Sequence, residues 1–373
     1  MPEYATIPGF NPHDVQGYRI VSPADPDLVI WVARDRALEP LCVTIGDQPV
    51  MYANPRGHLK APIPGDWTSH IEGYFTGGLD NAGAPVDKWD LPLHGTFSLT
   101  PAQKIQVNNN GDKITGVIDV TRMVTDPYLS VLRTVEAQGK HRSFVVADTV
   151  TAEADSEFMY LPHPNFPVRD GTRFYGNPQA VVASDLISNT DMDTFQVFKD
   201  VGKGSARFPP TQPLQNGSNL ADVRRENFER CYVMNMEPGK LGFVHVALVA
   251  PDMEIGAFLR YRPDDFMPMQ QAFQYLTNPR GGSAGLELGS CSKGREYAQD
   301  TEAHGGRSLM CALEAGESHQ FATEVGFLRG KSEVKGFIDQ HGLRSGDFNI
   351  TRADGLGPDN SHSELWKMYL ADL

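Results

Sequence analysis

Three segments of the chain carry side chains that could move protons. Residues 75–101 are rich in glycine, proline, Asp and Asn, and this stretch places His94 beside Gly95. Residues 160–167 hold His163 between two prolines, and residues 285–290 hold Glu287 in an otherwise apolar, glycine-flanked run. An imidazole has an ordinary pKa of about 6.5, so it can donate or accept a proton near neutral pH. Burial raises the pKa of a carboxylate toward the range where it is a useful base. These residue types favour general acid–base chemistry.

Each of the three residues also has a plain structural interpretation. His94 could be a satisfied histidine in a turn-rich connection, and His163 could be a loop histidine that bonds a carbonyl. Glu287 could be a solvated glutamate at the end of a strand. The prolines on both sides of His163 bias its backbone to an extended form, in which His163 and Asn165 point the same way. Taken alone, the segments leave both interpretations open.

The elements that must position these groups are predicted to be strands. Residues 104–153 repeat short β-branched runs broken by turns, which is typical of an antiparallel meander. The middle runs place apolar groups on both faces, so we expect these strands to be covered on both sides in a fold of two packed sheets. The same pattern returns in residues 231–234, 242–250, 255–261, 308–313 and 320–328. The predicted fold class is therefore all-β, with few short helices.

The remaining segments are predicted to be loops, apart from one helix. Residues 170–227 are rich in polar residues, proline and glycine, and we expect long surface loops there. A short capped helix is predicted to begin at Ser332 and to end at Gly342. The tail after it is polar and loop-like. We expect one domain over residues 1–373, with a core at about 40–340 and a C-terminal extension over 343–373.

Composition and charge narrow the classes of function. Of the 373 residues, 40% are hydrophobic, and 47 acidic against 33 basic residues give a net charge of −14. This charge opposes non-specific binding to nucleic acid or to an anionic membrane, so we expect a small or neutral partner. No secretory signal and no apolar run of about 20 residues is visible, so we expect a soluble cytoplasmic protein. Motifs for phosphate-binding loops, dinucleotide binding, serine hydrolases and zincins are absent.

The cysteines and two further histidines have structural interpretations. The four cysteines are scattered without metal-ligand spacing, and we expect buried free thiols. They are Cys42, Cys231, Cys291 and Cys311. His70 is expected to be exposed and His245 to lie in the core.

Several short motifs follow one another along the chain: G-G-L-D-N-A-G, L-P-L-H-G-T-F-S-L-T-P-A, L-R-T-V, V-A-D-T-V, L-P-H-P-N-F, G-L-E-L-G, and L-E-A-G-E with V-G-F-L. In this order they resemble the motifs of the aldose 1-epimerase (galactose mutarotase-like) superfamily. More narrowly, the chain resembles a poorly characterised bacterial branch of that superfamily, over roughly residues 40–340. Each motif alone is weak, and the resemblance rests on their order. It implies a β-supersandwich of large antiparallel sheets, with a broad cleft on one sheet that binds free sugars.

The resemblance also implies roles for particular residues. It places His94 at the first cleft histidine, His163 at the histidine that acts as general acid, and Glu287 at the carboxylate that acts as general base. The expected reaction needs no cofactor: the base removes the anomeric hydroxyl proton while the acid protonates the ring oxygen, and the open-chain aldehyde closes to the other anomer. Candidates for binding the sugar through amides or by stacking are Asn81, Asn165, Gln271, Trp89 and Phe273. We expect Arg133 and Asp148 to form a structural ion pair.

Substrate and reaction remain open in three respects. In better-known mutarotases an arginine in the glycine-rich region contacts the sugar, whereas residues 69–75 here contain none. One alternative is a sugar isomerase or epimerase acting at another carbon, with metal assistance through His94, His163 and Glu287. Another is a non-catalytic carbohydrate-binding protein. The leading interpretation has a small-molecule sugar as partner, no metal, no nucleic acid and no membrane, and a homodimer is one alternative for the oligomeric state.

Overall fold

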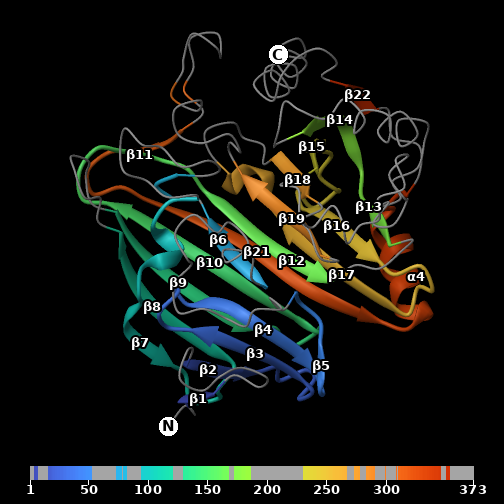
Figure 1. Ribbon diagram of the computed structural model, residues 1–373, viewed down its shortest axis with the longest axis horizontal. Helices are drawn as coiled ribbons and strands as arrows, with labels where there is room; N and C mark the ends of the chain where they lie inside the picture. Colours follow the sequence, from blue (N-terminus) through green and yellow to red (C-terminus); the bar gives the residue numbers. More distant parts are fainter. Residues whose placement is uncertain are drawn as a thin grey trace, which may run out of the picture.

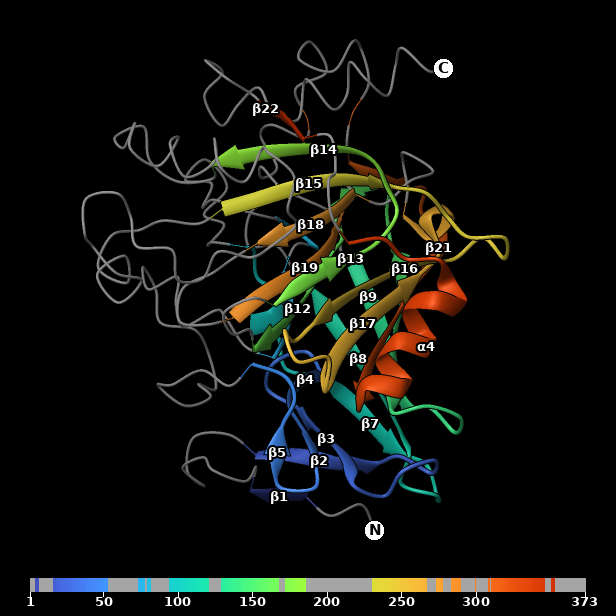
Figure 2. The same cartoon turned by 90° about the vertical axis from the view of Figure 1, so that its right-hand side faces the viewer.

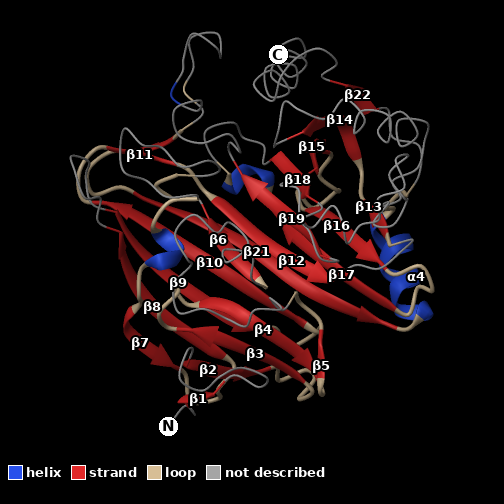
Figure 3. Ribbon diagram, in the orientation of Figure 1, coloured by secondary structure: helices blue, strands red, loops and turns tan. Residues whose placement is uncertain are grey.

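The computed structural model describes residues 4–6, 16–52, 73–77, 79–81, 94–120, 129–167, 172–185, 230–266, 273–277, 283–289, 299, 308, 310–345 and 350–352. These residues form an all-β fold of two large sheets and one smaller N-terminal sheet (Figures 1 and 3). The helical elements whose bounds lie in this part of the chain are one α-helix and two short 3-10 helices, η3 (Phe97–Leu99) and η4 (Pro263–Asp265). The predicted fold class is confirmed. Among the described residues, no helix has the length and apolar character needed to cross a membrane.

The larger sheet has eight strands in the order β13-β16-β17-β21-β10-β9-β8-β7. Its strands are β7 (Gln103–Val107), β8 (Lys113–Val120), β9 (Leu129–Ala137), β10 (Ser143–Ala152), β13 (Arg173–Tyr175), β16 (Val244–Val249), β17 (Ile255–Tyr261) and β21 (Ser318–Arg329). Strands β7 to β10 pair antiparallel in chain order, which confirms the predicted meander. The other strand pairs described in this sheet are antiparallel as well.

The prediction that the meander is covered on both faces is wrong. Residues along β8, β9 and β10 alternate between buried and partly exposed. Phe144, Val146 and Val150 lie in the core, whereas Val145 is only half-buried. The apolar run in β10 therefore reflects the β-branched residues that strands favour, and not a second covering layer.

The second large sheet carries the candidate site and has seven strands in the order β22-β14-β15-β18-β19-β12-β6. Its strands are β6 (Tyr74–Gly77), β12 (Leu161–Pro167), β14 (Pro178–Asp185), β15 (Arg230–Met236), β18 (Phe273–Thr277), β19 (Ser283–Gly289) and β22 (Ile350–Arg352). Strand β22 pairs parallel to β14 at the edge of the sheet. The remaining pairs are antiparallel.

Two loop predictions are corrected by strands of the two large sheets. Strands β13 and β14 lie inside residues 170–227, and β22 lies in the tail that was predicted to be loop-like. The apolar run from Ala180 to Ala183 in β14 is short and is flanked by Gln179 and Ser184. Strand β22 owes its place to pairing with β14, about half the chain away, so local composition gave no sign of it.

The N-terminal sheet lies at one end of the molecule, in the order β1-β2-β3-β4-β5 (Figures 1 and 2). Its strands are β1 (Tyr4–Thr6), β2 (Gln16–Val21), β3 (Leu28–Ala33), β4 (Glu39–Ile45) and β5 (Gln48–Pro49). A small two-stranded sheet joins β11 (Ser156–Phe158) to β20 (Cys311–Leu313). One hydrophobic cluster runs continuously from Ile20 in the N-terminal sheet to Phe327 in β21.

The two large sheets pack on each other through aromatic side chains. Phe166 of β12 contacts Phe327 of β21 edge to face, with ring centroids 6.4 Å apart. Tyr160, just before β12, stacks on Phe321 of β21 at 4.0 Å. Such rings bury a large apolar area and fix the spacing of the layers. The strand that carries His163 is therefore held in place by its packing on the eight-stranded sheet.

Helix α4 (Lys331–His341) covers β16 and β17 on the side away from β18 and β19 (Figure 2). The predicted end is confirmed, since Gly342 adopts a left-handed conformation with φ of 60° and its N–H bonds back into the last turn. The predicted Ser332 cap is wrong, because the helix begins at Lys331 after Gly330. Val334 is fully buried against Ala247 and Phe258 of the sheet.

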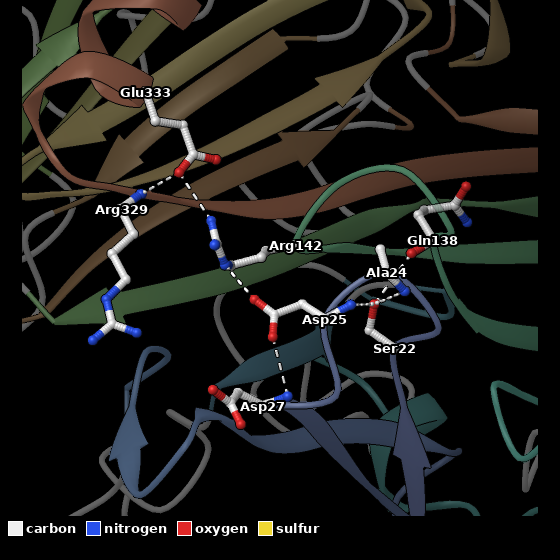
Figure 4. Close-up of polar contacts among 8 residues, drawn as sticks. All are labelled: Ser22, Ala24, Asp25, Asp27, Gln138, Arg142, Arg329 and Glu333. Atoms are coloured by element: carbon white, nitrogen blue, oxygen red, sulfur yellow. Dashed lines mark hydrogen bonds and ion pairs between the residues drawn. The ribbon is translucent and has the colours of Figure 1, made fainter.

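A polar network ties α4 to distant parts of the chain (Figure 4). Arg142, in the turn between β9 and β10, pairs with Asp25 near the end of β2 and donates to Glu333 Oε2 at 2.9 Å. The Arg329 N–H donates to the same oxygen of Glu333 at 3.0 Å. These groups are partly exposed, so each ion pair adds little stability. We interpret the network as fixing the position of α4 relative to the turn between β9 and β10.

Candidate functional site

The pairing of β12 with β19 sets His163 opposite Glu287. The two strands are antiparallel, with Asn165 across from Gly285 and Phe166 across from Ala284. Continuing this register by two residues places His163 across from Glu287. On its other side β12 pairs with β6, where His163 lies across from Phe75. The predicted extended conformation around His163 is thus a strand inside the seven-stranded sheet.

Alternation along both strands puts the two side chains on one face. Phe166 of β12 belongs to the core cluster, as do Leu286 and Leu288 of β19. Because successive residues of a strand point to opposite faces, His163 and Glu287 point away from the eight-stranded sheet. The apolar residues around Glu287 are therefore the core face of its strand, and Glu287 belongs to the opposite face.

His163 and Glu287 contact each other directly. The His163 Nε2 atom lies 3.0 Å from Glu287 Oε1, and the two side chains are only 8% and 6% exposed. Glu287 is therefore not the solvated strand-end glutamate that the sequence left open. Burial of a charged carboxylate is costly unless it is paired, and the imidazole supplies such a partner. The contact places an imidazole nitrogen directly beside a carboxylate oxygen.

His94 lies beside this pair. Its ring meets the His163 ring edge to face, with centroids 6.4 Å apart and planes at 90°. The His94 backbone has φ of 58°, which is unusual for a residue with a Cβ, and Gly95 follows with φ of 77°. The structure thus brings together three side chains that are far apart in the sequence: His94, His163 and Glu287.

The predicted sugar-binding residues are described only in part. Asn81 and Asn165 are fully buried, and the Asn165 amide Nδ2 donates to the backbone carbonyl of His163 at 3.2 Å. Phe273 begins β18, across from Gly289 of β19. Trp89 and Gln271 lie outside the described residues, as does His70.

Sequence reasoning gave no role to Asp80, which lies in the same site. Its carboxylate is fully buried and accepts hydrogen bonds from the Thr96 N–H and from the Thr96 hydroxyl. Thr96 is two residues after His94, so Asp80 holds the turn that presents this histidine. An acidic residue inside the glycine-rich G-G-L-D-N-A-G motif was a signal for such a role.

A buried ionic network lies between the two large sheets. Arg133 of β9 donates to both carboxylate oxygens of Asp148 in β10, at 2.8 and 2.6 Å, and both side chains are fully buried. This confirms the predicted ion pair. The Tyr160 hydroxyl donates to Asp148 Oδ2 at 2.7 Å, and burial, with Asp148 beside it, raises the Tyr160 pKa. Tyr160 precedes β12 and links this network to the strand that carries His163.

The remaining cysteine and histidine predictions have these outcomes. Cys42 and Cys311 are buried free thiols, and burial raises the Cys42 pKa to about 11. His245 is half-buried under α4 rather than fully in the core, and it stacks on His341 at 3.8 Å. Within the described part of the chain, no three His, Cys, Asp or Glu side chains are grouped so that they could hold a metal ion.

Solved structures with the same fold cover most of the chain. A "putative aldose 1-epimerase" from Klebsiella pneumoniae subsp. pneumoniae MGH 78578 has a TM-score of 0.68 at 15% identity, over 91% of this chain and 86% of that one. A galactose mutarotase-like protein from Clostridium acetobutylicum has a TM-score of 0.56 at 11% identity, over 88% and 98%. A galactose mutarotase related enzyme from Lactobacillus acidophilus has 0.54 at 13%, over 85% and 99%. No curated protein matches this chain.

The fold is therefore that of the galactose mutarotase-like proteins, as the order of sequence motifs predicted. The family described as "Domain of unknown function (DUF4432)" matches residues 15–207, just over half of the sequence, and the chain belongs to that family. The resemblance is confirmed at the level of the fold, and the family match is to a domain of unknown function. At these identities the structural likeness establishes the fold, and the activity must be argued from the site.

Proposed function

We propose that the protein is an aldose 1-epimerase, or mutarotase, which interconverts the anomers of a free sugar by general acid–base catalysis. The observation that carries the proposal is the buried 3.0 Å contact between His163 Nε2 and Glu287 Oε1, with His94 alongside. The fold of galactose mutarotase-like proteins supports it. In this proposal His163 is the general acid, Glu287 is the general base and His94 is the first histidine of the cleft, as the sequence resemblance implies.

The proposed reaction transfers two protons and breaks one bond. Glu287 accepts the proton of the anomeric hydroxyl while protonated His163 donates a proton to the ring oxygen. The bond between C1 and the ring oxygen breaks, and C1 becomes the carbonyl carbon of the open-chain aldehyde. Rotation about the C1–C2 bond presents the other face of the carbonyl. Ring closure then reverses both proton transfers, so the pair ends each turnover in its starting state.

The direct contact between the two side chains suits this substrate. The two oxygens that exchange protons are bonded to the same carbon of a hemiacetal, so their acid and base must be neighbours. Proton transfer converts an ion pair of imidazolium and carboxylate into two neutral groups, so no net charge develops in the buried site. Burial also strengthens each electrostatic interaction with the sugar.

The other candidate residues are assigned to binding. His94 lies at the edge of the His163 ring, where it can hold a sugar hydroxyl next to the reacting carbon. Asn81 and Asn165 supply amides, and Gln271, Trp89 and Phe273 are proposed as further contacts. The net charge of −14 favours a neutral sugar over an anionic one.

Anomer interconversion across a panel of free sugars tests the proposal. The rate is followed by polarimetry and by NMR of the anomeric protons, for the wild type and for Glu287→Gln. We expect the wild type to accelerate at least one sugar and Glu287→Gln to lose about 10²–10⁴-fold in rate, since a general base contributes that much. Glu324→Gln is the matched control, because Glu324 is also a buried strand glutamate, 8% exposed, but it bonds Ser143 and Arg260.

Other outcomes separate the alternatives. A new sugar in the NMR spectrum in place of a new anomer would indicate an isomerase or epimerase acting at another carbon. Sugar binding by calorimetry without any conversion would indicate a binding protein. Absence of acceleration with every sugar of the panel would refute the mutarotase proposal.

A further inference from the structure

We propose that Asp80 is a positioning residue for His94: it holds the left-handed turn at His94 and Gly95, and thereby sets the His94 imidazole against His163. The inference deepens the proposed function, since it rests on His94 working in that site. Asp80 acts through its hydrogen bonds to the N–H and to the hydroxyl of Thr96.

The first argument is the set of hydrogen bonds between Asp80 and Thr96. The Thr96 N–H lies 2.9 Å from Oδ1 and 2.8 Å from Oδ2 of Asp80, and the Thr96 hydroxyl donates to Oδ2 at 2.6 Å. Asp80 is fully buried, so these charge-assisted bonds form away from competing water. A buried carboxylate clamps one residue by both its backbone and its side chain.

The second argument is the backbone that this clamp holds. His94 and Gly95 are consecutive residues with positive φ, of 58° and 77°. For a residue with a Cβ such as His94 this conformation is unfavourable, so surrounding contacts must enforce it. A Cβ on Gly95 would overlap the Asp80 carboxylate and would lie 2.9 Å from the Asn81 backbone nitrogen. Asp80 therefore packs directly against the turn, and only glycine leaves it room.

The third argument connects Asp80 to the strand of His163. The carbonyl of Leu79 accepts a hydrogen bond from the Met159 N–H at 3.0 Å, two residues before β12 begins. Residues 79–81 are thus bonded on one side to the segment that leads into β12 and on the other to the His94 turn. Residues 79–81 therefore link the two segments that carry His94 and His163, whose ring centroids lie 6.4 Å apart. Loss of the Asp80 clamp should let the His94 ring move away from His163.

Two variants weaken the clamp in different ways, and each has a matched partner. Asp80→Asn keeps the shape of the side chain but replaces one acceptor oxygen by an amide that cannot accept from Thr96. Thr96→Val removes only the hydroxyl bond, whereas Thr96→Ser retains it. Asp155→Asn is the distant control, because Asp155 also accepts a backbone N–H, from Ala315 at 2.9 Å, in an exposed turn.

The decisive readout is NMR of the two imidazole rings in the absence of sugar. The ring signals are assigned with His94→Gln and His163→Gln. In the wild type we expect a nuclear Overhauser contact between the rings. In Asp80→Asn and Thr96→Val we expect that contact to be lost and the His94 ring signals to shift. Thr96→Ser and Asp155→Asn should keep the wild-type spectrum. A role of Asp80 in stability alone would leave the ring contact of the folded protein intact.

Kinetics give a second readout on any sugar that the wild type converts. Misplacement of a contact residue by about 1 Å can cost about 100-fold in rate, so we expect kcat of Asp80→Asn to fall by roughly 10- to 100-fold. Unchanged ring signals and ring contact in both folded clamp variants would overturn the proposal. If Asp80→Asn does not fold, the comparison of Thr96→Val with Thr96→Ser decides in the same way. Absence of activity in the wild type would refute the mutarotase proposal, while the ring contact would still decide the role of Asp80.

Discussion

The buried pair of Arg133 and Asp148 gives a prediction of stability that can be worked out atom by atom. Asp148 Oδ1 accepts from Arg133 Nε at 2.8 Å, while Oδ2 accepts from Arg133 Nη2 at 2.6 Å and from the Tyr160 hydroxyl at 2.7 Å. In Asp148→Asn an amide NH₂ replaces one of these oxygens, whichever way the amide points. At least one N–H of Arg133 then faces another donor, and the buried guanidinium loses its counter-charge.

The expected cost follows from this loss. Leaving a buried charge without its partner costs about 3–5 kcal/mol in the free energy of unfolding. At about 2 °C per kcal/mol for a large domain, the melting temperature should fall by roughly 6–10 °C. Tyr160→Phe removes one neutral-to-charged hydrogen bond and should cost about 1.5–3 kcal/mol. Lys113→Gln breaks an exposed pair with Glu136, whose side chains are 40% and 45% exposed, and should cost at most about 1 kcal/mol.

Urea unfolding and calorimetry of the three variants measure this order. The burial argument predicts that Asp148→Asn loses the most, Tyr160→Phe less, and Lys113→Gln the least. If Asp148→Asn is no less stable than Lys113→Gln, the guanidinium is stabilised by other contacts and the reasoning from burial is refuted.

Two further predictions concern pH and packing. Burial and the neighbouring His341 and Arg260 lower the His245 pKa to about 3, below the ordinary value of about 6.5, so the unfolded chain takes up the proton first. Neutral His245 therefore contributes its full stabilisation above pH 6.5, and this contribution is lost as pH falls toward 3. When pH is lowered from 7 to 4, the melting temperature of the wild type should fall more than that of His245→Phe. A difference between the two melting temperatures that stays constant over this range would contradict the argument. A Cβ on Gly326 would overlap the Phe258 ring, so Gly326→Ala should lower the free energy of unfolding by about 1–3 kcal/mol. A Cβ on Gly336 in α4 meets open space, so Gly336→Ala should raise the free energy of unfolding by about 0.4–1 kcal/mol. Chemical unfolding measures both values, and equal effects of the two substitutions would contradict the packing argument.

The sequence predicted those features that depend on local pattern. The β-branched runs separated by turns predicted the meander of β7 to β10, and the apolar stripe before Gly342 predicted the end of α4. Arg133 and Asp148, placed in neighbouring meander strands, were predicted to pair and do so. The motif order predicted the mutarotase-like fold.

Features that depend on long-range pairing were missed. Strand β22 exists because it adds to the edge of β14, and no local pattern distinguishes it from the polar tail. The outer face of the meander is partly exposed despite its apolar residues, because covering depends on which layers pack there. Likewise, Asp80 is 14 residues away from His94 in the sequence, and only the fold shows that its carboxylate bonds Thr96.

The role of Glu287 as general base is the central claim, and one rate comparison tests it most directly. The measurement is the rate of anomer interconversion by Glu287→Gln, relative to wild type and to Glu324→Gln, on a sugar that the wild type converts. The contact between His163 and Glu287 predicts a loss of about 10²–10⁴-fold for Glu287→Gln and wild-type rates for folded Glu324→Gln. Full activity of Glu287→Gln would contradict the account.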